Sequence, residues 1–282
     1  MRKIQFRVTR DMFPQVKDRY PYVYLEHGRL EVDDSSVKWI SADGYVVRLP
    51  VATIASLFLG PGTSVTHAAM HAVGSSGCTV CWTGAESLSF YAYGMPPTAD
   101  TEPLYRQCRL AFNPSSRVEV ARRMFSLRFP YADLEGKSLQ AMMGMEGVRV
   151  RRLYADLSEK YGVEWQGRAY VQGRPTEGNP ANRALTFLNQ LLYGICTSSL
   201  LALGYSPRIG FIHSGSPMPF VYDLADLYKS DLTIDLAFKL VSEGADVFDR
   251  HVLIDAFCAR LIERKVLGAF AETVNGVLDA EA

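Results

Sequence analysis

The residue pattern changes character once along the chain, at residues 94–97 (GMPP). Before this point, short runs of apolar or alternating residues are separated by turn residues such as His27 and Gly28, which is typical of β-strands. After it, apolar residues recur at the spacing of α-helices. Strands followed by helices indicate an α+β protein, and we predict two domains, residues 1–95 and 96–282.

The first domain is predicted to be an N-terminal β-sandwich with one short helix. Its first strand-like runs, from residue 22 to 59, are predicted to form a β-meander with tight turns. A short helix over 65–73 and two further strands at 79–82 and 89–93 follow. The runs are too short and too rich in β-branched residues for helices.

The second domain is predicted to be all-helical, because prolines fall between segments of helical periodicity. The predicted helices cover residues 101–113, 115–129, 138–161, 181–203, 218–229, 231–243 and 249–268. A chain of this length can bury a core without disulfides, so the five scattered cysteines are expected to be core thiols.

Charge and hydropathy exclude some classes of protein. No run of eighteen apolar residues and no secretory signal is present, so we expect a cytoplasmic protein without a membrane span. The 30 basic and 30 acidic side chains cancel, but residues 101–210 carry 15 basic and 9 acidic ones. This local basic excess fits nucleic-acid binding, and it equally fits solvated helix faces.

An acidic residue lies within an apolar helix face in the segment 138–161. On a helical wheel, Glu146 falls inside the stripe that contains Met142 and Leu157. A carboxylate buried there must be neutral, paired with a cation or bound to a metal ion. Pairing with Arg149, or a side chain that reaches solvent, would also account for the pattern.

A second unusual segment covers residues 210–231. His213 stands in a Gly/Ser/Pro-rich loop, and a helix is predicted to begin near Ser216. Asp223 and Asp226 are three residues apart and are predicted to share the polar face of this helix. Two carboxylates at this spacing repel each other unless a cation lies near them. They could equally be solvated acids favoured by the helix dipole.

Together, Glu146, His213, Asp223 and Asp226 supply oxygen ligands and one imidazole, a set that suits Mg²⁺ or Mn²⁺. Such ions support phosphodiester chemistry, because they activate a hydroxyl and offset charge on the phosphoryl oxygens. The chain has no GxSxG, HExxH or GxxxxGK[ST] motif, which argues against the common serine hydrolases, zinc proteases and P-loop enzymes.

Two long stretches of the chain resemble the CRISPR adaptation integrase family, most closely its subtype I-E branch. They are GMEGVRVRRLYADLSEKYGVEWQGRAY at 144–170 and LLYGICTSSLLALGYSPRIGFIHSGSPMPFVYDLADLYK at 191–229. The likeness runs in order from YLEHGRLEVDD to about residue 270. It implies a dimerising β-sandwich joined to a helical catalytic domain. It also implies divalent-metal ligands at Glu146, His213 and Asp226, with Asp223 as an additional catalytic acid.

The resemblance further implies a reaction and partners. Family members take double-stranded prespacer DNA with 3′ overhangs and join each 3′-OH to the CRISPR repeat, next to the leader, by transesterification. They form homodimers, two of which flank one dimer of a small ferredoxin-like CRISPR adaptation protein in a hetero-hexamer.

Side chains that bind DNA are expected in the basic middle of the chain. The resemblance also implies that three tyrosines lie where family members handle the single-stranded 3′ overhang, and aromatic faces suit unpaired bases. The candidates are Arg149, Arg151, Arg152, Arg122, Arg123, Arg128, Tyr170, Tyr193, Tyr222 and His27. His27 stands where some family members carry an aromatic wedge, and Ser216 stands where some carry a basic residue.

Two other functions are compatible with the sequence. One is a stand-alone, structure-specific nuclease that cuts branched DNA. The other is a non-catalytic DNA-binding scaffold, against which the presence of all four acidic and imidazole positions argues.

Overall fold

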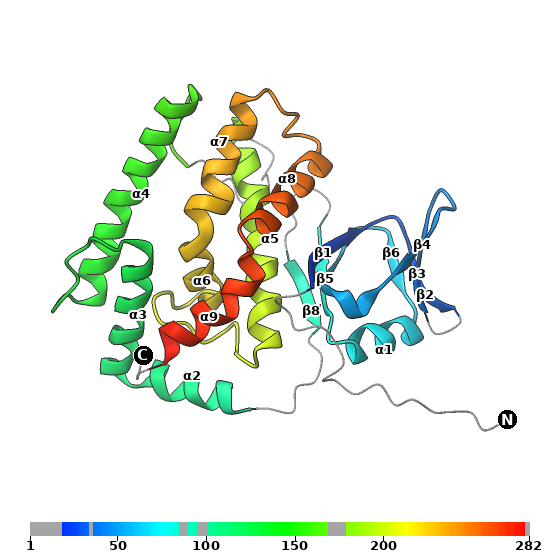
Figure 1. Cartoon of the computed structure of the whole chain (residues 1–282), viewed down its shortest axis with the longest axis horizontal. Coiled ribbons are helices and arrows are strands. Elements are labelled where there is room, and N and C mark those ends of the chain that lie inside the picture. Colours follow the sequence, from blue (N-terminus) through cyan, green and yellow to red (C-terminus); the bar gives the residue numbers. More distant parts are fainter. Residues whose placement is uncertain (1–18, 34–35, 85–89, 95–100, 169–178, 280–282) are drawn as a thin grey trace.

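The computed structural model of the protein describes residues 19–33, 36–84, 90–94, 101–168 and 179–279. The strands and helix α1 (His67–Ser75) gather at one end of the molecule and helices α2 (Glu102–Phe112) to α9 (Val266–Leu278) at the other (Figure 1). The α+β fold expected from the sequence is therefore confirmed. The predicted boundary between the domains lies outside the described residues.

The described residues of the strand-rich part form two four-stranded sheets, helix α1 and a short 3-10 helix (Val51–Thr53) (Figure 1). The first sheet has the order β1 (Tyr20–Leu25), β5 (Ile54–Leu59), β7 (Thr79–Thr83), β8 (Phe90–Gly94), and the second has the order β4 (Val46–Leu49), β3 (Ser36–Ser41), β2 (Gly28–Asp33), β6 (Thr63–Val65). Helix α1 (His67–Ser75) is capped by Thr66, whose side chain accepts a hydrogen bond from the Ala69 N–H. Side chains such as Trp39 and Leu57 fill the core of this part.

The predicted β-meander is only partly correct. Strands β2, β3 and β4 are antiparallel neighbours, as in a meander. Strand β5, however, pairs in parallel with both β1 and β7. Every residue of β5 is buried, and a strand that is apolar on both faces belongs in the middle of a covered sheet. Strand β6 was not predicted, because three residues are too few to show a period.

The helical part consists of successive helices, whose bounds agree closely with the predicted ones up to residue 243. They are α2 (Glu102–Phe112), α3 (Pro114–Arg128), α4 (Leu139–Tyr161), α5 (Pro180–Ala202), α6 (Pro219–Lys229), a π-helical turn (Ser230–Ile234), α7 (Asp235–Ser242), α8 (Arg250–Glu263) and α9 (Val266–Leu278).

Local sequence explains where the longest helices begin and end. The side chains of Asn113, Ser138 and Asn179 cap α3, α4 and α5 by accepting hydrogen bonds from backbone N–H groups. Helix α4 ends at Gly162, which has a φ of 62°, a conformation that glycine adopts without strain. The caps therefore hold α4, which carries Glu146, at both of its ends.

The last predicted helix, residues 249–268, is wrong as a single element. The helix is interrupted at Lys265, whose φ is 49°. The segment therefore forms two helices, α8 and α9, and α9 continues to Leu278. Helix α9 buries Phe270 and Val274 against the core. Its glycines lower intrinsic helix propensity, so packing rather than local preference maintains this helix.

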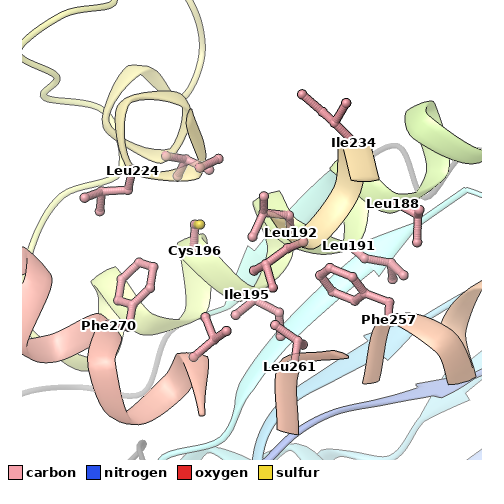
Figure 2. Close-up of a cluster of buried hydrophobic side chains, with 14 of the residues drawn as sticks. Leu188, Leu191, Leu192, Ile195, Cys196, Leu224, Ile234, Phe257, Leu261 and Phe270 are labelled. Carbon is pink, nitrogen blue, oxygen red and sulfur yellow. The ribbon is translucent and has the colours of Figure 1, made fainter. Parts of the chain in front are cut away.

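Helix α5 is the central helix of the protein. Figure 2 shows its side chains Leu191, Leu192 and Ile195 among residues of α8 and α9 such as Leu261 and Phe270. The helix is long and apolar enough to cross a membrane, but 89% of its most apolar window is buried inside the protein. This burial is what a core helix of a globular protein shows.

The core also accounts for the cysteines. All five are free thiols, and Cys78, Cys81, Cys196 and Cys258 are buried. Burial raises the pKa of Cys78 to about 12, so its thiol stays protonated. The expectation of core thiols is confirmed for these four residues, and Cys108 is half-buried.

Candidate metal centre

The structure brings Glu146, His213 and Asp226 together at the meeting point of α3, α4 and α6. Arg128, the last residue of α3, lies between the two carboxylates. Its Nη1 donates a hydrogen bond to Oε1 of Glu146 and lies 3.7 Å from Oδ2 of Asp226. His213 Nε2 is 3.9 Å from the same Asp226 oxygen. Residues that are far apart in the sequence thus face one small volume.

Glu146 is mostly buried, with 17% of its side chain exposed. Burial raises the pKa of this carboxyl group and the nearby Asp226 raises it further, while Arg128 acts in the opposite direction. The cation that pairs with Glu146 is therefore Arg128, and the alternative pairing with Arg149 is wrong. The Arg149 guanidinium instead lies over the Phe129 ring, 4.8 Å from its centre.

Asp223 is fully buried, which rules out the alternative that it is a solvated acid on the polar side of the helix. Its Oδ2 accepts hydrogen bonds from the backbone N–H groups of Phe211 and Ile212, at 2.6 and 3.1 Å. Its Oδ1 accepts one from the backbone N–H of His213 at 2.8 Å and lies 2.8 Å from Nδ1 of the imidazole. Asp223 therefore holds the loop that carries His213.

The contact with Asp223 also orients the imidazole. It engages Nδ1, so that Nε2 is the nitrogen that faces Asp226. The hydrogen bond from Nδ1 to Asp223 raises the pKa of His213, although burial opposes the charged form. A carboxylate behind a histidine is the usual way in which proteins fix the tautomer of a metal-binding imidazole.

The loop approaches Asp223 so closely that only glycine fits at its start. A Cβ on Gly210 would lie 2.8 Å from Cβ of Pro219 and 3.0 Å from Oδ2 of Asp223. Real side chains do not tolerate such contacts, so a substitution at Gly210 would push the loop away from the carboxylate.

Lys229 is a site residue that the sequence analysis missed. Its Nζ lies 2.7 Å from Oδ1 of Asp226 and 4.9 Å from the centre of the Tyr193 ring. Burial disfavours the charged amine, but Asp226 and Tyr193 outweigh this and raise the pKa of Lys229. The spacing of three residues from Asp226 was the available signal. The π-helical turn begins directly after Lys229, and such turns occur frequently at functional sites.

The donor atoms of the site fit a hard divalent cation. Two carboxylates and one imidazole nitrogen are ligands that Mg²⁺ and Mn²⁺ accept, and they converge from three different elements. Within the described residues, no three acidic, histidine or cysteine side chains are already spaced to hold an ion. Arg128 stands between Glu146 and Asp226, so an ion that used both would need this guanidinium to move.

The predicted DNA-binding tyrosines lie at different places. Tyr193 and Tyr222 meet edge to face, with ring centres 5.0 Å apart, and Tyr222 is also beside His213. Both therefore border the candidate metal centre. Tyr170 lies outside the described residues. His27 is exposed in the turn between β1 and β2, with a φ of 53°.

The predicted DNA-binding arginines also differ in accessibility. Arg151 and Arg152 are exposed on α4. Arg122 and Arg123 are used within the fold, where they donate to the backbone carbonyls of Leu134 and Val277, respectively, and pair with Glu119. The Oγ of Ser216 is buried and has no hydrogen-bond partner among the residues that the structure describes.

Comparison with known proteins establishes the family. The family model for CRISPR associated protein Cas1 matches residues 126–272. A protein named CRISPR-associated endonuclease Cas1 2, from Chlorobaculum tepidum, is 50% identical over 276 residues, which cover 98% of this chain and 93% of the relative. The chain belongs to the Cas1 family. The Cas1 endonuclease of Escherichia coli K12 is 36% identical over 84% of this chain and 78% of its own length, which is consistent with the subtype I-E likeness.

Solved Cas1 structures share the whole fold. A crystal structure of a TtCas1-DNA complex superposes with a TM-score of 0.82 and 36% identity, covering 93% of this chain and 92% of the other. A Cas6-RT-Cas1–Cas2 complex contains a chain that superposes with a TM-score of 0.70 over 94% of this chain and 36% of its own, and at 12% identity it shows the fold alone. Because the chain belongs to the Cas1 family of CRISPR-associated endonucleases, the protein is a nuclease.

Proposed function

We propose that this protein is the metal-dependent integrase and endonuclease of CRISPR adaptation, which inserts short prespacer DNA into a CRISPR array in the cytoplasm. The observation that supports this most directly is the convergence of Glu146, His213 and Asp226 on one partly buried volume in a Cas1-family chain. The site combines the ligands of a hard cation with neighbours that can receive DNA.

Glu146 and Asp226 would hold Mg²⁺ or Mn²⁺ through carboxylate oxygens, and His213 would hold it through Nε2. When bound, the ion lowers the pKa of an attacking hydroxyl and offsets negative charge on the phosphoryl oxygens. Asp223 acts as a positioning residue, because its contacts go to the His213 imidazole and to backbone N–H groups. Lys229 fixes the second oxygen of Asp226.

The reaction exchanges one phosphodiester bond for another. The 3′ oxygen of the prespacer forms a bond to a phosphorus atom of the CRISPR repeat, and the bond from that phosphorus to its original 3′ oxygen breaks. The attacking hydroxyl gives up its proton and the displaced 3′ oxygen takes one up, so the exchange is balanced. When water is the attacker, the same arrangement hydrolyses DNA and gives nuclease activity.

The surface around the site supports a path for the prespacer. Arg151 and Arg152 are exposed on α4 and can meet backbone phosphates of a duplex. Tyr193 and Tyr222 border the site, where an unpaired 3′ overhang would arrive. The DNA complex of TtCas1, which shares 36% identity with this chain, supports DNA as the substrate.

The partner in this proposal is the small ferredoxin-like CRISPR adaptation protein, which two homodimers of this chain would flank in a hetero-hexamer. The existence of a solved complex that contains Cas1 and Cas2 supports such a partner. The complex would bind the CRISPR repeat and leader DNA as its target.

The test is an integration assay with purified protein, its partner, a labelled prespacer with 3′ overhangs and a supercoiled plasmid carrying a CRISPR array. We expect integration with Mg²⁺ or Mn²⁺, and its loss in Glu146→Ala with DNA affinity unchanged, because the change removes a metal ligand and no phosphate contact. Efficient cutting of branched DNA without the partner, and no integration with it, would favour a stand-alone nuclease. Unchanged strand transfer in Asp226→Ala would favour a scaffold.

A further inference from the structure

Arg128 lies at the centre of the candidate metal centre but is neither a metal ligand nor an exposed DNA contact. Only 8% of its side chain is exposed, and one nitrogen atom, Nη1, faces both Glu146 and Asp226. A guanidinium cannot lose its proton in a protein, so this positive charge is permanent. It occupies the space between the two carboxylates that a divalent cation would share.

The pairing of Arg128 is also incomplete. Its Nε is buried and has no hydrogen-bond partner in the described part of the chain. By comparison, the Nε of Arg117, on the same helix, does have an acceptor: it donates to the backbone carbonyl of Phe211 at 2.8 Å. A buried donor without an acceptor destabilises the arrangement that contains it. The unpaired Nε weakens the hold of the site on Arg128, which otherwise rests on the two carboxylates and on the Phe129 ring, 5.2 Å from the guanidinium carbon.

We propose that Arg128 is the built-in counter-cation of this site and competes with the divalent ion for Glu146 and Asp226. Before the ion binds, the guanidinium holds the two carboxylates together and limits their mutual repulsion. The ion can use both carboxylates only after Arg128 has moved out from between them. This inference rests on the metal dependence in the proposed function.

The proposal makes opposite predictions for ion binding and for stability. Loss of Arg128 should destabilise the ion-free protein, because two partly buried carboxylates are left facing each other. The same change should strengthen ion binding, because the competing charge is absent. A residue that only maintained the shape of the site would have the contrary effect, since its loss would weaken ion binding.

The experiment measures Mn²⁺ binding to the full chain by isothermal titration calorimetry and by electron paramagnetic resonance. We expect Arg128→Gln to bind Mn²⁺ about tenfold more tightly than the wild type, in line with the effect of one nearby unit charge on an ionisable site. Its melting temperature should be lower than that of the wild type without Mn²⁺ and should recover with it. In Glu146→Gln/Arg128→Gln the recovery should disappear, because one ligand is missing.

Arg106→Gln is the matched control. Arg106 is more exposed than Arg128, with 29% of its side chain accessible. Like Arg128, it has a buried Nε without a partner in the described residues and forms an ion pair, at 2.6 Å with Asp279. Its contacts are with Asp279 and Tyr205 rather than with the site. We expect Arg106→Gln to leave Mn²⁺ affinity unchanged.

Several outcomes would overturn the inference. If Arg128→Gln bound Mn²⁺ only as tightly as the wild type, or more weakly, the proposed competition would be refuted. The proposed metal dependence would still stand. If neither protein bound Mn²⁺, the metal dependence itself would fail, and this inference with it. Should Arg128→Gln not fold, a crystal structure of the wild type with Mn²⁺ decides: we expect Nη1 beyond hydrogen-bond distance of both carboxylates, and an ion bound beside an unmoved Arg128 would refute the inference.

Discussion

Asp223→Asn is the substitution that tests most directly how the site is organised. The side chain keeps its shape and loses its charge. The amide oxygen of the asparagine can still accept hydrogen bonds from the backbone N–H groups of Phe211 and Ile212, as Oδ2 does at 2.6 and 3.1 Å. The amide NH₂ then faces the backbone N–H and Nδ1 of His213, where Oδ1 now lies at 2.8 Å from each. The hydrogen bond from the backbone N–H of His213 is lost, and the one between Nδ1 and a charged acceptor is replaced by a neutral hydrogen bond.

The expected loss of stability follows from these two bonds. A hydrogen bond to a charged group contributes about 1.5–3 kcal/mol and a neutral one about 1 kcal/mol, so losing one charged bond and weakening the other should lower the free energy of unfolding by roughly 3 kcal/mol. For a chain of this size that corresponds to a decrease in melting temperature of about 6 °C. Differential scanning calorimetry measures it, with the exposed Asp133→Asn as the control.

The substitution should also impair metal binding through the imidazole. An amide NH₂ donates to Nδ1, which places the proton of the neutral ring on Nε2, the nitrogen that would bind the ion. Loss of the carboxylate behind a metal-binding histidine lowers affinity about 10–100-fold. Isothermal titration with Mn²⁺ measures this change. Loss of integration with unchanged Mn²⁺ affinity and unchanged stability would refute the positioning role and favour Asp223 as an acid that acts on DNA.

Three further predictions concern the DNA surface, the core and the support of α4. Arg151→Gln should reduce the salt dependence of DNA binding by about one unit of slope, whereas Arg122→Gln should leave the slope unchanged, as fluorescence anisotropy at several salt concentrations would show. Leu191→Ala should lower the free energy of unfolding by about 2–5 kcal/mol in denaturant titrations, because Leu191 is fully buried, and the exposed Ile262→Ala should have little effect. Burial alone would raise the pKa of Asp235, but hydrogen bonds from Tyr161 and other partners lower it. Asp235→Asn should therefore lower the melting temperature at pH 7. The difference in melting temperature from the wild type should shrink as the pH falls below about 4, because the wild-type carboxylate then becomes protonated.

The sequence predicted the parts of the fold that depend on local periodicity. The helices that carry or border the site, α3 to α6, lie close to their predicted positions. Asn113, Ser138 and Asn179 cap α3, α4 and α5, and α6 begins with Pro219. Helix α9 was missed because glycines and threonine weaken its local signal. The pairing of β5 with β1 and β7 was missed because strand partners are distant in sequence.

The candidate site shows the same division. Glu146 was identifiable because a carboxylate within an apolar stripe is locally unusual, and His213 because its loop precedes a helix with two aspartates. Asp223 and Asp226 have the same side chain on the same helix, yet one is fully buried behind His213 and the other faces Arg128. No local pattern distinguishes them, since the difference arises from the loop that folds over α6.

The amino-acid order alone thus determined that a strand-rich part precedes a helical part, which helix carries an out-of-place carboxylate, and which residue types are available for a divalent cation. The tertiary structure decided which strands lie side by side, that Asp223 supports the imidazole, and that Arg128 stands between Glu146 and Asp226. The physical reason is the distance along the chain over which each kind of interaction acts. Periodicity and capping act over a few neighbouring residues, whereas the partner of a buried charge depends on how separate helices come together in space.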